Sequence, residues 1–347
     1  MVAFGLHLLC IIFCLLFQRN RLLAGSTLAL MWLLFVTSNG LPDQQYYIVH
    51  FQNAAALSDK GLGYASVVAL FNALGLGYPG FLFFVGTFYL GVVGLGAFKF
   101  TDRPALVMAL VSIFPLCMEV DQLRNALAFS FVMVGFLVVY ARKADVGGCV
   151  WYCVFCLIGG CIHIGVLPFL LFVVAYRCNI EQVVIVGVGV FLLGHILISL
   201  DGVSIFLNML GLYERYGSQA PSFDLACTIR MAAPALCWIL IAGLVNAQEK
   251  TKRLMPARWI ASSNILILAL TPLVSYEPSL FRIEGLQFAM AYLLAIAAMG
   301  KNDRTAIQDT FMLLLVALCG FALMLGGSIT ADVCVPFYLN NPIFNFL

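Results

Sequence analysis

Hydrophobic runs separated by short charged segments are the main pattern along this chain. A helix needs about 20 mostly apolar residues to cross the hydrocarbon of a bilayer, and most of the runs approach that length. The pattern therefore predicts membrane-spanning helices. We expect them at residues 2–17, 22–38, 80–98, 104–118 with a kink at Pro115, 125–141, 183–200, 229–246, 259–275, 284–299 and 309–326.

Two apolar segments are ambiguous. Residues 61–80 are rich in glycine and only moderately apolar, so they either cross the membrane or form a shallow re-entrant element. Residues 146–176 would make a helix of about 46 Å, which is long for one crossing and short for two. Gly159, Gly160 and Pro168 predict a break near His163, so we expect two short helices there. If 61–80 does not cross, the chain has about 12 transmembrane helices.

The distribution of basic residues supports this arrangement. Thirteen of the 18 lysines and arginines, among them Arg19, Arg21, Arg177 and Arg258, fall in the loops predicted to face the cytoplasm. This is the bias that multi-pass proteins show. If residues 61–80 crossed the membrane, or if residues 146–176 crossed it only once, most of these charges would face outward. We therefore expect one transmembrane domain over residues 1–347, with outer polar segments at about 39–61 and 201–228.

Composition narrows the class of protein. Hydrophobic residues make up 63% of the chain, charged residues 10%, and the mean hydropathy is +1.04, which excludes a soluble protein. The net charge of +2 and the absence of a glycine-rich phosphate loop after a strand-like segment argue against nucleic-acid or nucleotide partners.

The five remaining basic residues and ten of the 16 acids fall on the predicted outer side, as a site that opens there requires. The outer basic residues are Lys60, Arg124, Arg215, Arg230 and Arg282. The outer acids are Asp43, Asp59, Glu119, Asp121, Asp201, Glu214, Asp224, Glu277, Glu284 and Asp332.

The segment 118–130 carries the clearest signal, because it places two acids and an arginine against a hydrophobic run. Arg124 shares one helical face with Ala128 and Gly135, which leaves room beside the guanidinium. We expect an anion site there, with Asp121 or Glu119 as counter-charge. The alternative is that Asp121 caps the helix and pairs with Arg124, marking only the water interface.

Arginine suits phosphate chemistry, because its planar fork binds phosphate oxygens bidentately and keeps its charge. Several arginines at an outer face could hold the pyrophosphate of a polyprenyl-linked sugar as it leaves. Glycosyl transfer also needs a base for the proton of the incoming hydroxyl. The candidate bases, among which spacing does not choose, are His163, Asp43, Glu119 and Asp121.

Each of these residues also has a structural explanation. Arg215, Arg230 and Arg282 could snorkel to the interface or pair with nearby acids. His163 could form an interhelical hydrogen bond. Cys149, Cys153 and Cys156 share one face of a hydrophobic helix, where small packing residues explain them better than a metal site. We therefore expect no metal site and no cofactor.

Several short motifs follow one another along residues 39–340: Asp43-Gln-Gln-Tyr46-Tyr47, Gln122-Leu-Arg124-Asn-Ala-Leu-Ala128, Ile162-His163-Ile-Gly-Val-Leu-Pro168, Tyr213-Glu-Arg215-Tyr216 and Phe281-Arg282-Ile283. In this order they resemble the EpsG-like family of bacterial polysaccharide polymerases, which are related to Wzy-type O-antigen polymerases. Val335-Pro336-Phe337-Tyr338 is similar to the family's closing element, although Phe337 stands where a tyrosine is expected.

The resemblance implies an all-α, polytopic membrane helical bundle of the GT-C-like kind with an outer-face site. It implies a multi-pass enzyme of the bacterial inner membrane that joins undecaprenyl-pyrophosphate-linked oligosaccharides on the periplasmic side. Membrane lipid surrounds it, a chain-length regulator protein is a possible partner, and no metal or nucleotide sugar is needed.

The resemblance also suggests roles for single residues. Arg124 would bind the donor pyrophosphate with help from Arg282, and His163 would transfer a proton or orient a hydroxyl. Asp43 and Tyr46 would line the entrance. Arg215, with Tyr216 beside it, and Arg230 are assigned to substrate binding, the two arginines more from their charge than from the motifs.

Three alternatives remain, and two of them, the flippase and the scaffold, belong to other classes of protein. A lipid-linked oligosaccharide flippase needs charge along a path open to both sides, which the one-sided clustering disfavours. An O-antigen ligase, or another polyprenyl-dependent glycosyltransferase, cleaves the same phosphate–sugar bond and is not separable by sequence. A membrane scaffold would not need the outer pairs of acid and arginine.

Overall fold

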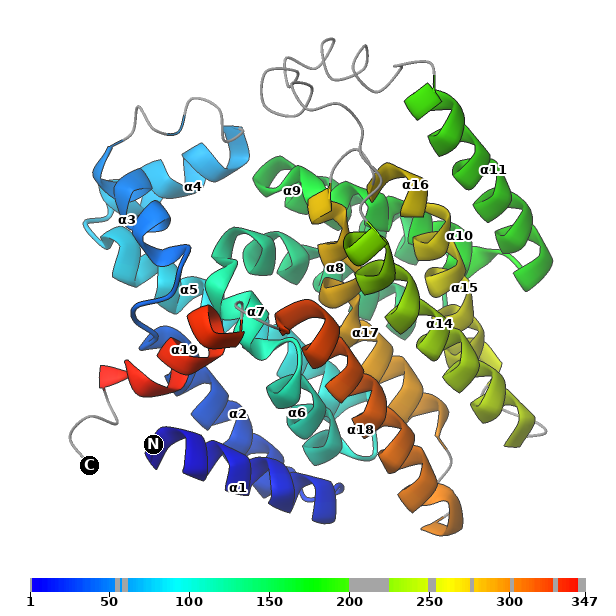
Figure 1. The fold of residues 1–347 in the computed structure, drawn as a ribbon, viewed down its shortest axis with the longest axis horizontal. Coiled ribbons are helices and arrows are strands. Elements are labelled where there is room, and N and C mark those ends of the chain that lie inside the picture. The colour runs from blue at the N-terminus through cyan, green and yellow to red at the C-terminus, as the bar shows by residue number, and fades with distance from the viewer. Residues whose placement is uncertain are drawn as a thin grey trace. The chain divides into compact units, whose positions relative to one another are not determined.

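The computed structural model describes residues 2–53, 57, 62–199, 225–248, 254–274, 278–299, 303–326 and 330–342. Within these ranges every regular element is a helix (Figure 1). Five segments in the described part are long and apolar enough to cross a membrane: Gly77–Phe100, Leu123–Ala141, Ile180–Ile198, Leu225–Val245 and Ile307–Leu325. Six shorter apolar segments accompany them. The chain is thus an all-helical, multi-pass membrane protein, and the number of crossings stays a prediction.

The contacts of the chain group into two compact units. Unit 1 comprises Met1–Leu170 and Phe288–Leu347, and unit 2 comprises Leu171–Gln287. Unit 1 contains α1 (Val2–Leu16), α2 (Arg21–Val36), α3 (Gln44–Gln52), α4 (Leu62–Ala73), α5 (Gly77–Phe100), α6 (Pro104–Ile113), α7 (Leu116–Asp121), α8 (Leu123–Ala141), α9 (Val146–Ile162), most of the 3-10 helix η2 (Ile164–Leu171), α18 (Asp303–Leu325), the short π-helix η4 (Thr330–Cys334) and α19 (Val335–Leu339). Unit 2 contains α10 (Phe172–Arg177), α11 (Ile180–Ser199), α14 (Leu225–Gln248), α15 (Leu254–Ala269), α16 (Thr271–Val274) and the 3-10 helix η3 (Pro278–Phe281). The division falls inside α17 (Arg282–Ala298). The expectation of a single transmembrane domain remains a prediction.

Both predicted helix breaks are confirmed. The 104–118 run is divided at Phe114 and Pro115 into α6 and α7, because proline lacks the amide hydrogen that would continue the helix. The 146–176 run breaks at His163, the C-terminal cap of α9, and continues as η2 and α10.

The other ambiguous segment, 61–80, forms α4 and the first turn of α5. α4 has 12 residues, or about 18 Å of helix, which is shorter than the hydrocarbon core. The chain then turns at Gly75 and Gly77, whose φ angles of 70° and 54° favour glycine. The outer polar segment before it is not all loop, since α3 lies there and packs on α4 (Figure 1).

Small residues bring the helices around the start of α8 close together. A Cβ added to Gly159 of α9 would lie 2.6 Å from the carbonyl oxygen of Ala128 of α8. A Cβ added to Gly63 of α4 would collide with the backbone of Cys161 near the end of α9. The N-terminal part of α8, the start of α4 and the end of α9 therefore meet at one end of unit 1.

Unit 2 is built around α15, which packs against α10, α11 and α14. Trp259 of α15 is fully buried, and its ring centroid lies 4.7 Å from that of Tyr176. Gln287 links the elements through polar contacts, because its amide donates to Asn264 Oδ1 at 2.6 Å and to Glu284 Oε2.

Candidate functional site

Arg124 lies at the start of α8, among side chains of α3 and α4. Only 9% of the residue is exposed. Its backbone N–H donates to the Tyr47 hydroxyl at 3.2 Å, and its guanidinium carbon lies 5.4 Å from the centroid of the Tyr64 ring. The ring face attracts the cation, and the hydroxyl satisfies an N–H that the first turn of a helix leaves without a partner. The backbone and the side chain of Arg124 are thus both held by tyrosines.

Further rings support these two tyrosines. His50 Nδ1 lies 3.3 Å from the Tyr64 hydroxyl, and the His50 ring centroid lies 3.9 Å from that of Tyr46. Tyr46 is 41% exposed, whereas Tyr47 is buried. Burial raises the pKa of the Tyr47 hydroxyl, so it keeps its proton while accepting from Arg124. This cluster of Tyr46, Tyr47, His50 and Tyr64 thus holds Arg124 in place and exposes the Tyr46 ring.

The two acids on α7 differ in environment. Asp121 is half-buried and its Oδ1 accepts a hydrogen bond from the backbone N–H of Asp43 at 3.1 Å, which ties the start of α3 to the end of α7. Glu119 is completely buried, and neither of its carboxylate oxygens has a hydrogen-bond partner within the described ranges. Burial raises the pKa of Glu119 well above its usual range, which favours the protonated, neutral carboxyl.

The alternative role of Asp121 as a cap is not what the structure shows. The residue at the N-cap of α8 is Gln122, whose side chain makes no capping hydrogen bond. Its Oε1 instead accepts from Asn125 Nδ2 at 2.7 Å. Across the described residues, no ion pair joins the Arg124 guanidinium to Asp121 or to Glu119. The guanidinium N–H groups therefore remain available for a ligand.

His163 belongs to the same end of unit 1. It follows α9 two residues after Cys161, whose backbone touches Gly63 next to Tyr64. The His163 Nδ1 accepts from the Gly165 backbone N–H at 3.1 Å, and the residue is half-buried. The structure places His163 near α4 and records no direct contact between it and Arg124.

The other predicted arginines belong to unit 2 or lie outside the described residues. Arg230 of α14 stacks on Phe281, with its guanidinium carbon 5.4 Å from the ring centroid, and Arg282 follows Phe281 in the chain. Arg282 makes no ion pair with Glu284 in the described part of the chain. Arg215 and Tyr216 lie outside the described residues. That Arg282 helps Arg124 to bind the donor pyrophosphate stays a prediction.

The assembled site, from Asp43 through Tyr64 and Arg124 to His163, lies inside the region that the sequence model of the EpsG family matches, residues 22–337. The chain belongs to the EpsG family. Membership indicates a membrane glycosyltransferase- or polymerase-like role in polysaccharide biosynthesis. Comparison with curated proteins and with solved structures gave no match.

For this EpsG-family chain, sequence reasoning missed the two tyrosines in direct contact with Arg124. Tyr47 stands in the quoted Asp43–Tyr47 motif, but Tyr46 received the role. Tyr64 lies in the segment that drew attention only for its glycines. The available signal was a run of polar aromatic residues, Tyr46, Tyr47, His50 and Tyr64, in an otherwise apolar protein.

Proposed function

We propose that this protein is a polysaccharide polymerase of the bacterial inner membrane. It transfers an oligosaccharide from a polyprenyl pyrophosphate onto a second lipid-linked repeat at the periplasmic face. The observation that carries the proposal is the setting of Arg124, whose guanidinium is held by the Tyr64 ring while its N–H groups have no protein partner in the described ranges.

Arg124 is suited to the diphosphate of the donor. The Tyr64 ring holds the guanidinium carbon 5.4 Å from its centroid, and the guanidinium N–H groups, which bind two phosphate oxygens at once, have no partner among the described residues. In a site mostly shielded from water such a pair is stronger than in solution. Because the charge on the leaving diphosphate grows during the reaction, this contact strengthens in the transition state.

The reaction replaces one bond at the anomeric carbon with another. A hydroxyl oxygen of the acceptor sugar forms a bond to that carbon, and the bond from the carbon to the phosphate oxygen breaks. The electron pair leaves with the diphosphate, whose charge Arg124 stabilises. The hydroxyl proton passes to a base on the protein.

Asp121 and His163 are both half-buried, so either side chain can meet the substrate and act as the base. Glu119 is the weaker choice, because its carboxyl is completely buried, away from the substrate, and burial favours its protonated form. Asp121 ends α7 three residues before Arg124 and is hydrogen-bonded to the start of α3, so it is our first assignment. The exposed ring of Tyr46, which contacts His50 and Tyr47, offers an apolar face for a sugar ring.

The test of the function is a strain that lacks the gene, complemented with the gene and analysed for surface polysaccharide by size. Chains that stop at one repeat and regain a ladder on complementation support the proposal. Loss of lipid-linked repeats from the outer leaflet indicates a flippase instead, and free polymer not attached to its acceptor indicates a ligase.

The base is assigned by two substitutions that preserve local hydrogen bonds. Asp121→Asn keeps an oxygen for the Asp43 N–H, and His163→Asn keeps an acceptor for the Gly165 N–H. If Asp121 is the base, its variant shows no ladder at normal protein level, while His163→Asn retains part of it. The reverse result moves the role to His163.

A further inference from the structure

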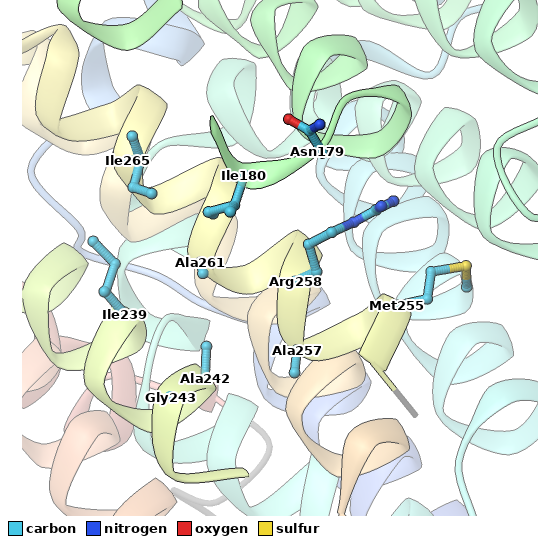
Figure 2. Close-up of a pocket in the computed structure, with 10 residues that line it drawn as sticks. All are labelled: Asn179, Ile180, Ile239, Ala242, Gly243, Met255, Ala257, Arg258, Ala261 and Ile265. Carbon is cyan, nitrogen blue, oxygen red and sulfur yellow. The ribbon is translucent and has the colours of Figure 1, made fainter. Parts of the chain in front are cut away.

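Unit 2 contains a cavity of about 710 Å³ between α11, α14 and α15 (Figure 2). Its walls are mostly aliphatic or small, among them Ile239 and Gly243 of α14 and Ile265 of α15. Binding pockets for small molecules have volumes of about 300–1,000 Å³ and mainly apolar walls with a few placed polar groups. The cavity has that size and that kind of lining.

Arg258 is the charged residue among the lining side chains, and no acid accompanies it there. Its Nη2 donates to the backbone oxygen of Tyr176 at 3.3 Å, while its Nε is buried without a hydrogen-bond partner in the described part of the chain. Nε is not accessible from the cavity, whereas Nη1 is not buried and has no hydrogen-bond partner among the described residues. The cavity therefore holds a positive charge with unused donors.

Asn179 adds a second polar group at the start of α11. Its Oδ1 accepts from the Gln182 backbone N–H at 2.9 Å, and Gln182 Oε1 accepts from the Asn179 backbone N–H at 3.1 Å. This reciprocal cap leaves the side-chain NH₂ of Asn179 as a donor, at a helix end that favours negative charge. Figure 2 shows Asn179 and Arg258 toward one side of the cavity, and Ile239 and Ile265 toward the other.

These features describe a ligand with one anionic end and an apolar remainder. The bilayer supplies such molecules directly, because α11 and α14 both contain candidate membrane spans. Arg177, Lys250, Lys252 and Arg253 stand near the ends of the same helices in sequence, and the charge bias predicts that this end faces the cytoplasm. Basic pockets on that side bind the headgroups of anionic lipids.

We propose that this cavity binds an anionic phospholipid of the inner leaflet. The lipid phosphate accepts hydrogen bonds from Arg258 and from the Asn179 amide, and an acyl chain lies along Ile239 and Ile265. The inference does not rest on the polymerase function, because lipid retention is measured without substrate.

The experiment uses the full chain in nanodiscs that contain equal amounts of phosphatidylglycerol and phosphatidylcholine with identical acyl chains. Native mass spectrometry after release counts each retained lipid. We expect wild type to retain phosphatidylglycerol selectively, and Arg258→Gln to lower that retention about tenfold. Arg177→Gln is the matched control. It removes an exposed charge next to the same helix without altering the cavity, and we expect retention like that of wild type.

A second pair of variants tests whether the apolar part of the cavity holds the acyl chain. A Cβ added to Gly243, which lines the cavity, or to Gly189, which does not, meets nothing within 4 Å. Both variants are therefore expected to fold. Gly243→Phe fills the cavity and should abolish selective retention, whereas Gly189→Phe should not.

Several outcomes overturn the assignment. Equal retention of the two lipids by wild type removes the anionic preference, and equal behaviour of Arg258→Gln and Arg177→Gln removes the role of Arg258. Displacement of phosphatidylglycerol by an equal amount of polyprenyl phosphate reassigns the cavity to a different lipid.

Discussion

Arg124 and Arg258 are two arginines with unused donors in very different surroundings. Arg124 lies among the rings of Tyr47 and Tyr64, with the half-buried carboxylate of Asp121 three residues away. Arg258 lies at an apolar cavity whose lining includes no acid and no aromatic ring. A cation with a nearby proton acceptor can take part in transfer of a sugar, because both leaving-group stabilisation and proton removal are provided. A cation at a cavity whose lining includes no acid can hold an anionic lipid but has no base beside it.

The largest effect should come from Arg124→Lys. Lysine keeps the charge but loses the planar fork, so the diphosphate is held by one contact instead of two. We expect the rate of polymer formation to fall about 100-fold, with a normal amount of protein in the membrane. The measurement is the length distribution of the polysaccharide in the complemented strain.

The control for this prediction lies at the other end of the same helix. Arg142 is exposed, and its Nε lies 2.9 Å from Asp145 Oδ1 in an ion pair. Arg142→Lys should leave the ladder unchanged, because an exposed ion pair contributes little. Long polymer from Arg124→Lys would remove Arg124 from the mechanism.

The next largest effect on the rate is expected from the Tyr64 ring, which contacts the Arg124 guanidinium. Tyr64→Leu removes the attraction between ring and cation, which is about 2 kcal/mol in a site shielded from water, and we expect a rate roughly tenfold lower or more. Tyr64→Phe retains the ring and loses only the contact with His50, so its rate should stay close to that of wild type. Equal losses in the two variants would mean that the hydroxyl matters and the ring does not.

The sequence predicted the parts of the fold that depend on local chemistry. Prolines and glycines weaken helices, so the breaks at Pro115 and His163 were found, although α14 continues through Pro234. An arginine in a hydrophobic run is costly without a function, so Arg124 was singled out. Both results follow from a few neighbouring residues.

What the sequence could not predict depends on packing between distant segments. The contact between Tyr47 and Arg124 joins residues 77 positions apart, and the ring of Tyr64 comes from a separate helix. Glu119 and Asp121 looked equivalent in sequence. Residues two apart do not share a helical face, however, and the structure buries the first while leaving the second half-buried. From the sequence, Arg258 was placed only among the cytoplasmic charges. Its cavity forms where three helices pack together, and no local pattern in the sequence predicts that packing.

A smaller effect is expected on stability at the Arg124 site. Tyr47→Phe leaves the Arg124 backbone N–H without its acceptor at 3.2 Å, in a buried position. We expect a loss of about 1–2 kcal/mol in the free energy of unfolding. Thermal unfolding of the purified protein measures it, with Tyr46→Phe as control, because the Tyr46 ring is 41% exposed. An unchanged midpoint for Tyr47→Phe would show that water replaces the hydroxyl.

The smallest effect is the pH dependence contributed by Glu119. Burial raises the pKa of its carboxyl in the folded protein above the value of 4.5 that it has in the unfolded chain, so between those two values the folded state binds the extra proton. Stability therefore falls as the pH rises from the unfolded pKa toward the folded one. Glu119→Gln cannot ionise and escapes this loss. Its thermal midpoint should exceed that of wild type by about 1–3 °C at about pH 8, with a smaller difference at about pH 5. A pH-independent difference would mean that the glutamine side chain changes packing rather than charge. A lower midpoint at about pH 8 would show that the ionised carboxylate stabilises the fold and returns Glu119 to the group of possible bases.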